Sequence, residues 1–346
     1  MAFQARTDYQ NHAIGWLQRG YSFLGGGTVV QFLRIWMSSG KCQLSIYLGD
    51  AKMKFIPYML ALAVLTFSAN AYAIEFKTLS GTYEDSTGRK VTLGFDVKQH
   101  LLKLPPPRPD VNQSTWLLEP ASPKYYVIIF VGGKGIVKCP KKLEDPSFGK
   151  NWLTRTRLDY ANAGASVAIY CAPDDRWDRK VGLLKGRGQN NYRTSVEFET
   201  DFSNLVAKLK ARHDVPVVVS GTSAGAVAAL YITQKKPDLV DILVMSSAGT
   251  VTHKGQPESI ISDLNADKIQ QPTLLVSHVD DPCKFSPIAK SKQLFDAIGS
   301  AKKQHVIMEG GKKRKGNACR FFSAHQFYGI EKETVAKIIK FIELNL

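Results

Sequence analysis

Residues 217–232, VVVSGTSAGAVAALYI, place a serine between two glycines where a strand pattern gives way to a helix pattern. Gly221 and Gly225 flank Ser223 as in a G-x-S-x-G turn, which holds its serine on a strained backbone packed closely against neighbouring chain. A serine in this setting can serve as the nucleophile of an acyl transfer. The pentapeptide alone is a weak signal, and the strand-to-helix context is what favours Ser223 as a catalytic residue.

A serine nucleophile needs a base, and the base needs an acid that holds it in the right tautomer. The segment TLLVSHVDDPCKF ends a predicted strand and contains Asp280 and Asp281, while NACRFFSAHQFYGIE follows the last predicted strand and contains His325. We therefore predict Ser223 as nucleophile, Asp281 as acid and His325 as base. Asp281 is preferred because it precedes proline in a D-P turn, and Asp280 would then face solvent or shape the loop.

Acyl transfer also requires donors that stabilise the oxyanion. One predicted donor is the backbone N–H of Ala224, directly after the nucleophile. The other comes from the glycine-rich turn VGGKG at 131–135, where Gly133 or Lys134 would donate. A phosphate-binding loop is a weaker interpretation, because the turn lacks a Walker lysine-serine ending and a complete G-x-G-x-x-G. No cofactor is predicted.

The elements that must position these residues alternate along the chain from residue 125 onward. Strands are predicted at 125–130, 166–170, 217–220, 242–246, 273–277 and 305–308, and helices at 195–212 and 332–344. The strands are apolar almost throughout, as in a parallel sheet that is buried on both faces. Residues 74–120 predict antiparallel strands at the sheet edge. The pattern predicts an α/β fold with a mostly parallel, doubly wound sheet.

The stretch MKFIPYMLALAVLTFSANAYA, residues 53–73, has a positive start, an apolar run and a small-x-small ending. These features predict a signal peptide cleaved after Ala73, because the apolar run is shorter than the roughly 20 residues of a membrane span. The mature protein would be periplasmic or secreted, without an integral membrane segment. Residues 1–52 show no sustained periodicity, and we predict that translation begins at Met53. Residues 74–346 would form one domain.

Four cysteines follow the leader, at positions 139, 171, 283 and 319, and their even number in an exported protein suggests two disulfides. Cys283 lies two residues after Asp281, and Cys319 lies six before the predicted base. A working triad brings these loops together, so we predict a bond between 283 and 319. Cys139 and Cys171 follow neighbouring strands and form the second predicted pair. The spacing disfavours a zinc site, and no metal is predicted.

The chain is basic, with 46 Lys and Arg against 30 Asp and Glu. Removing the 6 basic and 2 acidic residues before Ile74 leaves 40 basic residues against 28 acidic residues. The basic residues are spread out and lack interleaved aromatics or a binding motif, so a nucleic-acid partner is not expected. The only dense cluster, residues 312–315, reads as a solvated loop, with attraction to an anionic substrate or membrane surface as the alternative.

Several segments together carry a resemblance to the α/β-hydrolase superfamily: KNWLTRTR, YCAPDD, YRTSVEFETD, SGTSAGA, SHVDDPC and AHQFYGIE. They are most similar to a group of exported bacterial α/β hydrolases without an assigned substrate, over residues 104–346. The resemblance implies the fold, the three catalytic roles and a periplasmic setting. Ala224 departs from the group, which often has a larger or basic residue after the nucleophile, so pocket details do not transfer.

Residues 246–272 are too few for a large cap domain, so an open site is expected. Its walls would come from residues 136–156 and 172–194, which contain Trp152, Arg155, Arg157, Arg176, Trp177 and Arg193. As a group, these arginines favour a small acyl substrate that is polar or anionic. The main hypothesis is a serine hydrolase of esters, and the alternatives are an acyltransferase and a non-catalytic binding protein. The intact set of serine, aspartate and histidine argues against the last.

Overall fold

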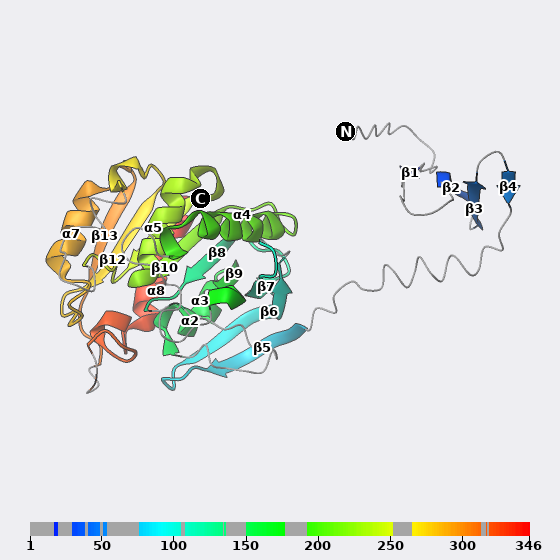
Figure 1. Cartoon of the computed structure of the whole chain (residues 1–346). Helices are drawn as coiled ribbons and strands as arrows, with labels where there is room; N and C mark the ends of the chain where they lie inside the picture. The colour runs from blue at the N-terminus through cyan, green and yellow to red at the C-terminus, as the bar shows by residue number, and fades with distance from the viewer. Residues whose placement is uncertain are drawn as a thin grey trace. The chain divides into compact units, whose positions relative to one another are not determined.

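A computed structural model describes most of the chain after residue 75. The described residues are 76–104, 108–133, 135, 150–176, 192–251, 265–312, 316 and 318–346, together with the backbone of 17–19, 30–38, 41–48 and 51–53. The chain divides into two compact units, Met1–Ala73 and Ile74–Leu346 (Figure 1).

The first unit contains a small antiparallel sheet in the order β1-β2-β3-β4. Its strands are β1 (Leu17–Arg19), β2 (Val30–Ser38), β3 (Lys41–Leu48) and β4 (Ala51–Met53). They occupy a segment for which the sequence predicted no regular element. Residues 54–73 of the predicted signal peptide lie outside the described residues, so the leader, its cleavage and the start at Met53 stay predictions. Among the described helices, none is long and apolar enough to cross a membrane.

The second unit is built on a nine-stranded sheet in the order β13-β12-β11-β10-β8-β9-β7-β6-β5. Its strands are β5 (Phe76–Glu84), β6 (Lys90–Lys103), β7 (Ser114–Pro120), β8 (Tyr125–Phe130), β9 (Ala165–Tyr170), β10 (Val217–Thr222), β11 (Ile242–Ser246), β12 (Thr273–His278) and β13 (Lys303–Met308). Strands β8 to β13 pair in parallel, and β5, β6 and β7 form an antiparallel edge. The predicted α/β architecture is confirmed, with strand ends shifted by no more than two residues.

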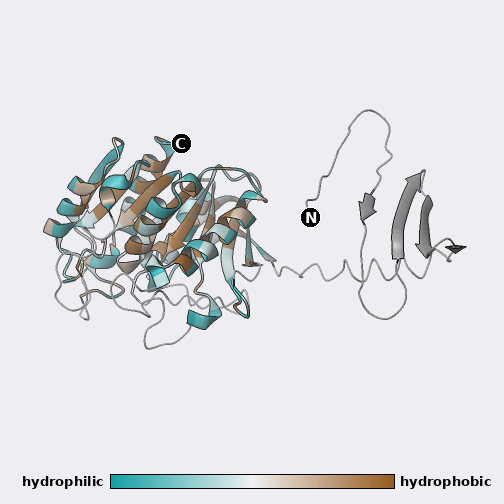
Figure 2. Cartoon of the chain, turned by 45° about the horizontal axis from the view of Figure 1, so that its top comes forward, coloured by the Kyte–Doolittle hydropathy of each residue, from teal (hydrophilic) through white to brown (hydrophobic). Residues whose placement is uncertain are grey.

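Helices cover both faces of this sheet (Figure 1). They are α2 (Trp152–Arg155), α3 (Arg157–Asn162), α4 (Val196–Lys210), α5 (Ala224–Lys235), α7 (Ile288–Ala297) and α8 (Glu331–Glu343). One hydrophobic layer contains side chains of α4, α5 and α7, and the other contains side chains of α2, α3 and α8. Alternate residues of β8 enter the two layers, and Figure 2 shows the hydrophobic residues gathered on the strands.

The sequence around α4 explains why this helix begins and ends where it does. Ser195 caps its start, with a side chain that accepts a hydrogen bond from the backbone N–H of Phe198. Acidic residues in the first turn and lysines in the last complement the helix dipole. The buried face, which includes Phe202 and Leu205, packs against the sheet. The observed bounds lie within the predicted range of 195–212.

Parallel pairing brings the carboxyl ends of β8, β10, β12 and β13 to one edge of the sheet. The segments that follow these strands contain the glycine-rich turn, Ser223, Asp281 and His325. In α/β sheets this edge is where functional sites form. The fold therefore gathers the residues that the sequence singled out.

Candidate active site

Ser223 occupies a strained turn between β10 and α5, with φ 55° and ψ −123°. A non-glycine residue in such a conformation costs about 1–3 kcal/mol and needs support from its surroundings. The Ser223 N–H donates to the carbonyl of Ser246 at 2.9 Å, and its carbonyl accepts from the N–H of Gly249 at 3.0 Å. A Cβ at Gly221 would lie 2.3 Å from the carbonyl oxygen of Gly225, so the predicted glycine requirement has a direct steric cause.

Asp281 and His325 form a buried pair. The Nδ1 of His325 lies 2.8 Å from the Oδ2 of Asp281, and their side chains are 0% and 2% exposed. The other carboxylate oxygen accepts from the N–H of Cys283 at 2.9 Å. With Nδ1 donating to the carboxylate, Nε2 carries the lone pair and can take up a proton. Nε2 has no hydrogen-bond partner among the described residues.

The two neighbouring aspartates differ in environment. Asp280 is exposed, and its backbone N–H donates to Nδ1 of His278 at 3.0 Å. The Nε2 of His278 then donates to the carbonyl of Gly310 at 3.0 Å. The structure thus brings Asp281, and not Asp280, to His325, while their catalytic roles stay predictions.

Ser286 is a third polar group of this pair, and the sequence analysis missed it. Its buried hydroxyl donates to the Oδ2 of Asp281 at 2.8 Å and lies 3.0 Å from Nδ1 of His325. No motif marks this serine, because its role depends on a residue 39 positions further along the chain.

A disulfide joins the loop of the acid to the loop of the histidine. Cys283 and Cys319 are 36 residues apart and have Cα atoms 4.6 Å from each other, which confirms the predicted pairing. Cys171 is also disulfide-bonded. Its predicted partner, Cys139, lies outside the described residues.

Trp152 links the nucleophile turn to the histidine loop. Its indole N–H donates to Oγ1 of Thr222 at 3.1 Å, and its backbone N–H donates to Oε1 of Gln326 at 3.1 Å. Thr222 directly precedes Ser223, and Gln326 directly follows His325. No hydrogen bond joins Ser223 to His325 within the described structure, whereas this buried tryptophan forms a polar connection between the two loops.

The turn after β8, which contains the predicted donor Gly133, lies close to the nucleophile. A Cβ added to Gly132 would lie 2.9 Å from Cβ of Ser223, so the turn after β8 passes directly against this serine. Within the described part of the chain, the N–H groups of Ala224 and Gly133 donate to no other group. Their role as oxyanion donors stays a prediction. Lys134, the other predicted donor, lies outside the described residues.

The arginines predicted to line the pocket are bonded within the protein. Arg155 pairs with the carboxylate of Glu331 at 2.8 Å, and Arg176 pairs with that of Asp175 at 3.3 Å. Arg157 donates to the carbonyl of Thr154 at 2.7 Å, and Arg193 donates to two backbone carbonyls. Burial lowers the pKa of Arg155 from its usual value. Of these four arginines, Arg155 and Arg176 are paired with carboxylates, and a polar or anionic substrate stays a prediction. Trp152 lies in the interior, and Trp177 is not among the described residues.

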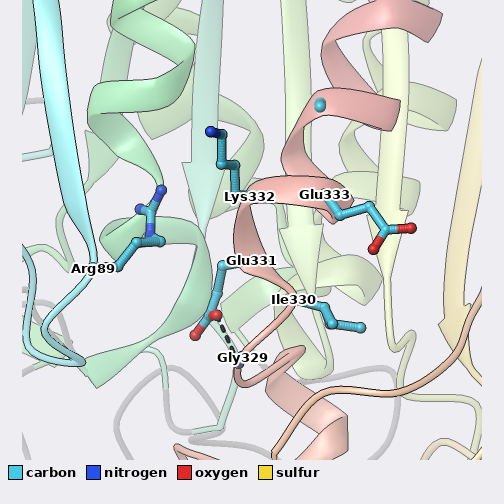
Figure 3. Close-up of a pocket in the computed structure, with 7 residues that line it drawn as sticks. Arg89, Gly329, Ile330, Glu331, Lys332 and Glu333 are labelled. Atoms are coloured by element: carbon cyan, nitrogen blue, oxygen red, sulfur yellow. Dashed lines mark hydrogen bonds between the residues drawn. The ribbon is translucent and has the colours of Figure 1, made fainter.

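A hollow of about 560 Å³ lies elsewhere, at the start of α8 (Figure 3). Arg89 and Glu331 line it, but Arg89 is ion-paired with Asp85 and Asp159, and Glu331 accepts from the N–H of Gly329 at 2.7 Å. The predicted triad is not among the residues that line it. Among the described residues, no three His, Cys, Asp or Glu side chains gather as metal ligands would.

The fold is similar to that of solved structures of hydrolases. A dienelactone hydrolase from Anabaena variabilis matches with a TM-score of 0.50 and 14% identity, over 72% of this chain and 99% of its own. A cold-adapted esterase from an Arctic intertidal metagenomic library matches with a TM-score of 0.50 and 13% identity, over 78% and 99%. No protein-family model matches the sequence, and no curated protein is detectably similar to it. The chain has the α/β-hydrolase fold.

Proposed function

We propose that the protein is a serine hydrolase that cleaves an ester or related acyl bond. The observation that carries this proposal is the buried His325, with Nδ1 bonded to Asp281 and Nε2 left without a partner in the described structure. The strained turn of Ser223, tied through Trp152 to the histidine loop, supplies the nucleophile. The names of the two similar structures, an esterase and a dienelactone hydrolase, favour ester bonds.

In the proposed reaction, Oγ of Ser223 attacks the acyl carbon and its proton passes to Nε2 of His325. The Asp281 carboxylate stabilises the imidazolium that forms. The N–H groups of Ala224 and Gly133 stabilise the oxyanion, and one such donor is typically worth about 10²–10³-fold in kcat. His325 then gives its proton to the leaving alcohol, and water releases the acyl group by the reverse sequence.

Covalent labelling of the purified full chain by a fluorophosphonate, with p-nitrophenyl acetate turnover measured on the same samples, tests the proposal. Ser223→Ala is expected to lose labelling and to lower turnover by about 10⁴-fold or more. Ser291→Ala replaces a buried serine of α7 and should retain both. A folded wild type that is neither labelled nor active would contradict the proposal.

We also propose that the protein is exported and begins at Ile74 after cleavage. The Cys283–Cys319 bond supports this, because disulfides persist in oxidising compartments. Sequencing the N-terminus of the protein recovered from its native host should give Ile-Glu-Phe. A peptide from residues 1–50 would contradict the predicted start at Met53.

A further inference from the structure

Arg193 is a buried arginine that bonds to the turn beside the nucleophile. It lies in the short 3-10 turn η5 (Tyr192–Thr194) and is 2% exposed. Its Nη1 donates to the carbonyl of Gly133 at 2.8 Å, and its Nη2 donates to the carbonyl of Val131 at 3.0 Å. The two terminal nitrogens of one guanidinium therefore hold two carbonyls of the turn that follows β8.

These two bonds orient the peptide groups of the turn. A trans peptide is planar, so its N–H points away from its own carbonyl. Because the Val131 carbonyl faces Arg193, the N–H of Gly132 faces the opposite side. The carbonyl of Gly132 accepts from the N–H of Gly135 at 3.2 Å. All three carbonyls of residues 131–133 are thus occupied. The N–H of Gly133 belongs to the same peptide as the Gly132 carbonyl, so Arg193 holds the peptide group on each side of this donor.

The turn needs such support because glycines make it conformationally free. Gly133 has φ 60° and Gly135 has φ 62°, and glycine loses more conformational entropy on ordering than other residues. The turn also lies against Ser223, since a Cβ on Gly132 would approach the serine Oγ to 3.6 Å. Any relaxation of the turn would move its N–H groups relative to the reacting oxygen.

We propose that Arg193 is a positioning residue that preorganises the oxyanion-binding turn by holding the peptide groups on either side of the Gly133 N–H. This inference rests on the proposed serine hydrolase function. The planar guanidinium suits the task because it presents two donors at a fixed spacing, whereas a lysine offers one compact ammonium group. Burial lowers the pKa of Arg193 to about 10, so the side chain remains protonated at neutral pH.

The test compares hydrolysis of an aryl ester with hydrolysis of its thionoester, in which sulfur replaces the carbonyl oxygen. Sulfur is larger and a weaker hydrogen-bond acceptor, so the ratio of the two rates reports on the oxyanion donors. Arg193→Met is expected to lower kcat for the ester by about 10²-fold with little change in KM, and to lower the oxygen-to-sulfur ratio strongly. Arg193→Lys should give a kcat and an oxygen-to-sulfur ratio between those of Arg193→Met and of the wild type.

Arg89→Lys is the matched control, because Arg89 is also largely buried and ion-paired but lies at the β5–β6 turn. It should keep the wild-type ratio. A folded Arg193→Lys or Arg193→Met with the wild-type ratio would overturn the proposal, as would a loss of activity at constant ratio. A wild type that hydrolyses neither ester overturns the proposed function, and this inference falls with it.

Discussion

The two halves of the candidate site are held by different kinds of contact. The nucleophile turn is held by backbone packing, since a Cβ at Gly225 would lie 2.2 Å from the carbonyl oxygen of Phe130. The acid–histidine half is held by side chains and a covalent bond: Asp281 and Ser286 contact the imidazole of His325, and a disulfide joins their loops.

This difference predicts how each half responds to change. The nucleophile turn belongs to the junction of β8, β10 and α5, so a change there should reduce stability and activity together. The acid–histidine half lies in loops, so a change of its polar side chains should reduce activity while leaving most of the fold intact. Only loss of its disulfide should also reduce stability.

The largest effect is expected for Gly225→Val. The added side chain would meet backbone atoms of Phe130, and such atoms cannot move without disturbing β8. We expect a loss of more than about 3 kcal/mol in the free energy of unfolding, seen by thermal or urea denaturation. In Gly94→Ala the new Cβ meets only the Oδ1 of Asn162 at 3.6 Å, so its stability should change by less than about 1 kcal/mol. A stable, active Gly225→Val would show that the turn is not held by packing.

Asp281→Asn should have the next largest effect, on activity alone. An amide cannot stabilise the imidazolium and favours the wrong tautomer of His325, so kcat should fall by about 10³–10⁴-fold. Asp280→Asn is the neighbouring control and should stay within threefold, because Asp280 is exposed. Steady-state kinetics together with melting temperatures measure this contrast. Equal losses in the two variants would contradict the assignment of the acid.

Some parts of this site could be predicted because they depend on short patterns of neighbouring residues. Apolar runs located the six parallel strands, and five of them are buried at every position, as expected for strands covered on both faces. The expectation was wrong for β13, which is the last strand of the sheet and is buried only at Met308. The G-x-S-x-G pattern located the nucleophile turn at Ser223, because its glycines meet a local steric requirement. The chain order and the D-P turn selected Asp281, and the cysteine positions selected the disulfide.

The remaining contacts could not be predicted, because they join residues that are distant in the chain. Trp152 and Thr222 are 70 positions apart, and Arg193 and Gly133 are 60 apart. Charged residues are usually exposed, and the sequence therefore predicts that the arginines line a pocket. Arg155 is instead buried against Glu331, since a buried guanidinium is tolerated when carbonyls and a carboxylate receive it.

The disulfide tests how much the acid–histidine half relies on its covalent link. In the double variant Cys283→Ser/Cys319→Ser, the 36-residue separation implies a loss of up to about 4 kcal/mol by the chain-entropy relation. We expect kcat to fall by about tenfold, because Asp281 accepts from the N–H of Cys283 and shares that loop. Denaturation and turnover are measured without reductant, so that the bond at Cys171 stays intact. If the double variant is destabilised but keeps wild-type activity, the disulfide stabilises the fold and does not contribute to catalysis.

The smallest effect concerns Trp152, which connects the two halves. Trp152→Phe keeps an aromatic ring against Phe327 but removes the indole N–H that bonds to Thr222. A double-mutant cycle with Thr222→Val, read in kcat and in the free energy of unfolding, should give a coupling of about 1 kcal/mol. The single variants should lower kcat by a few fold. Coupling in both quantities would mean that the hydrogen bond aligns the nucleophile with the base. Coupling in stability alone would mean that the two halves are positioned independently and that Trp152 only fills the space between them.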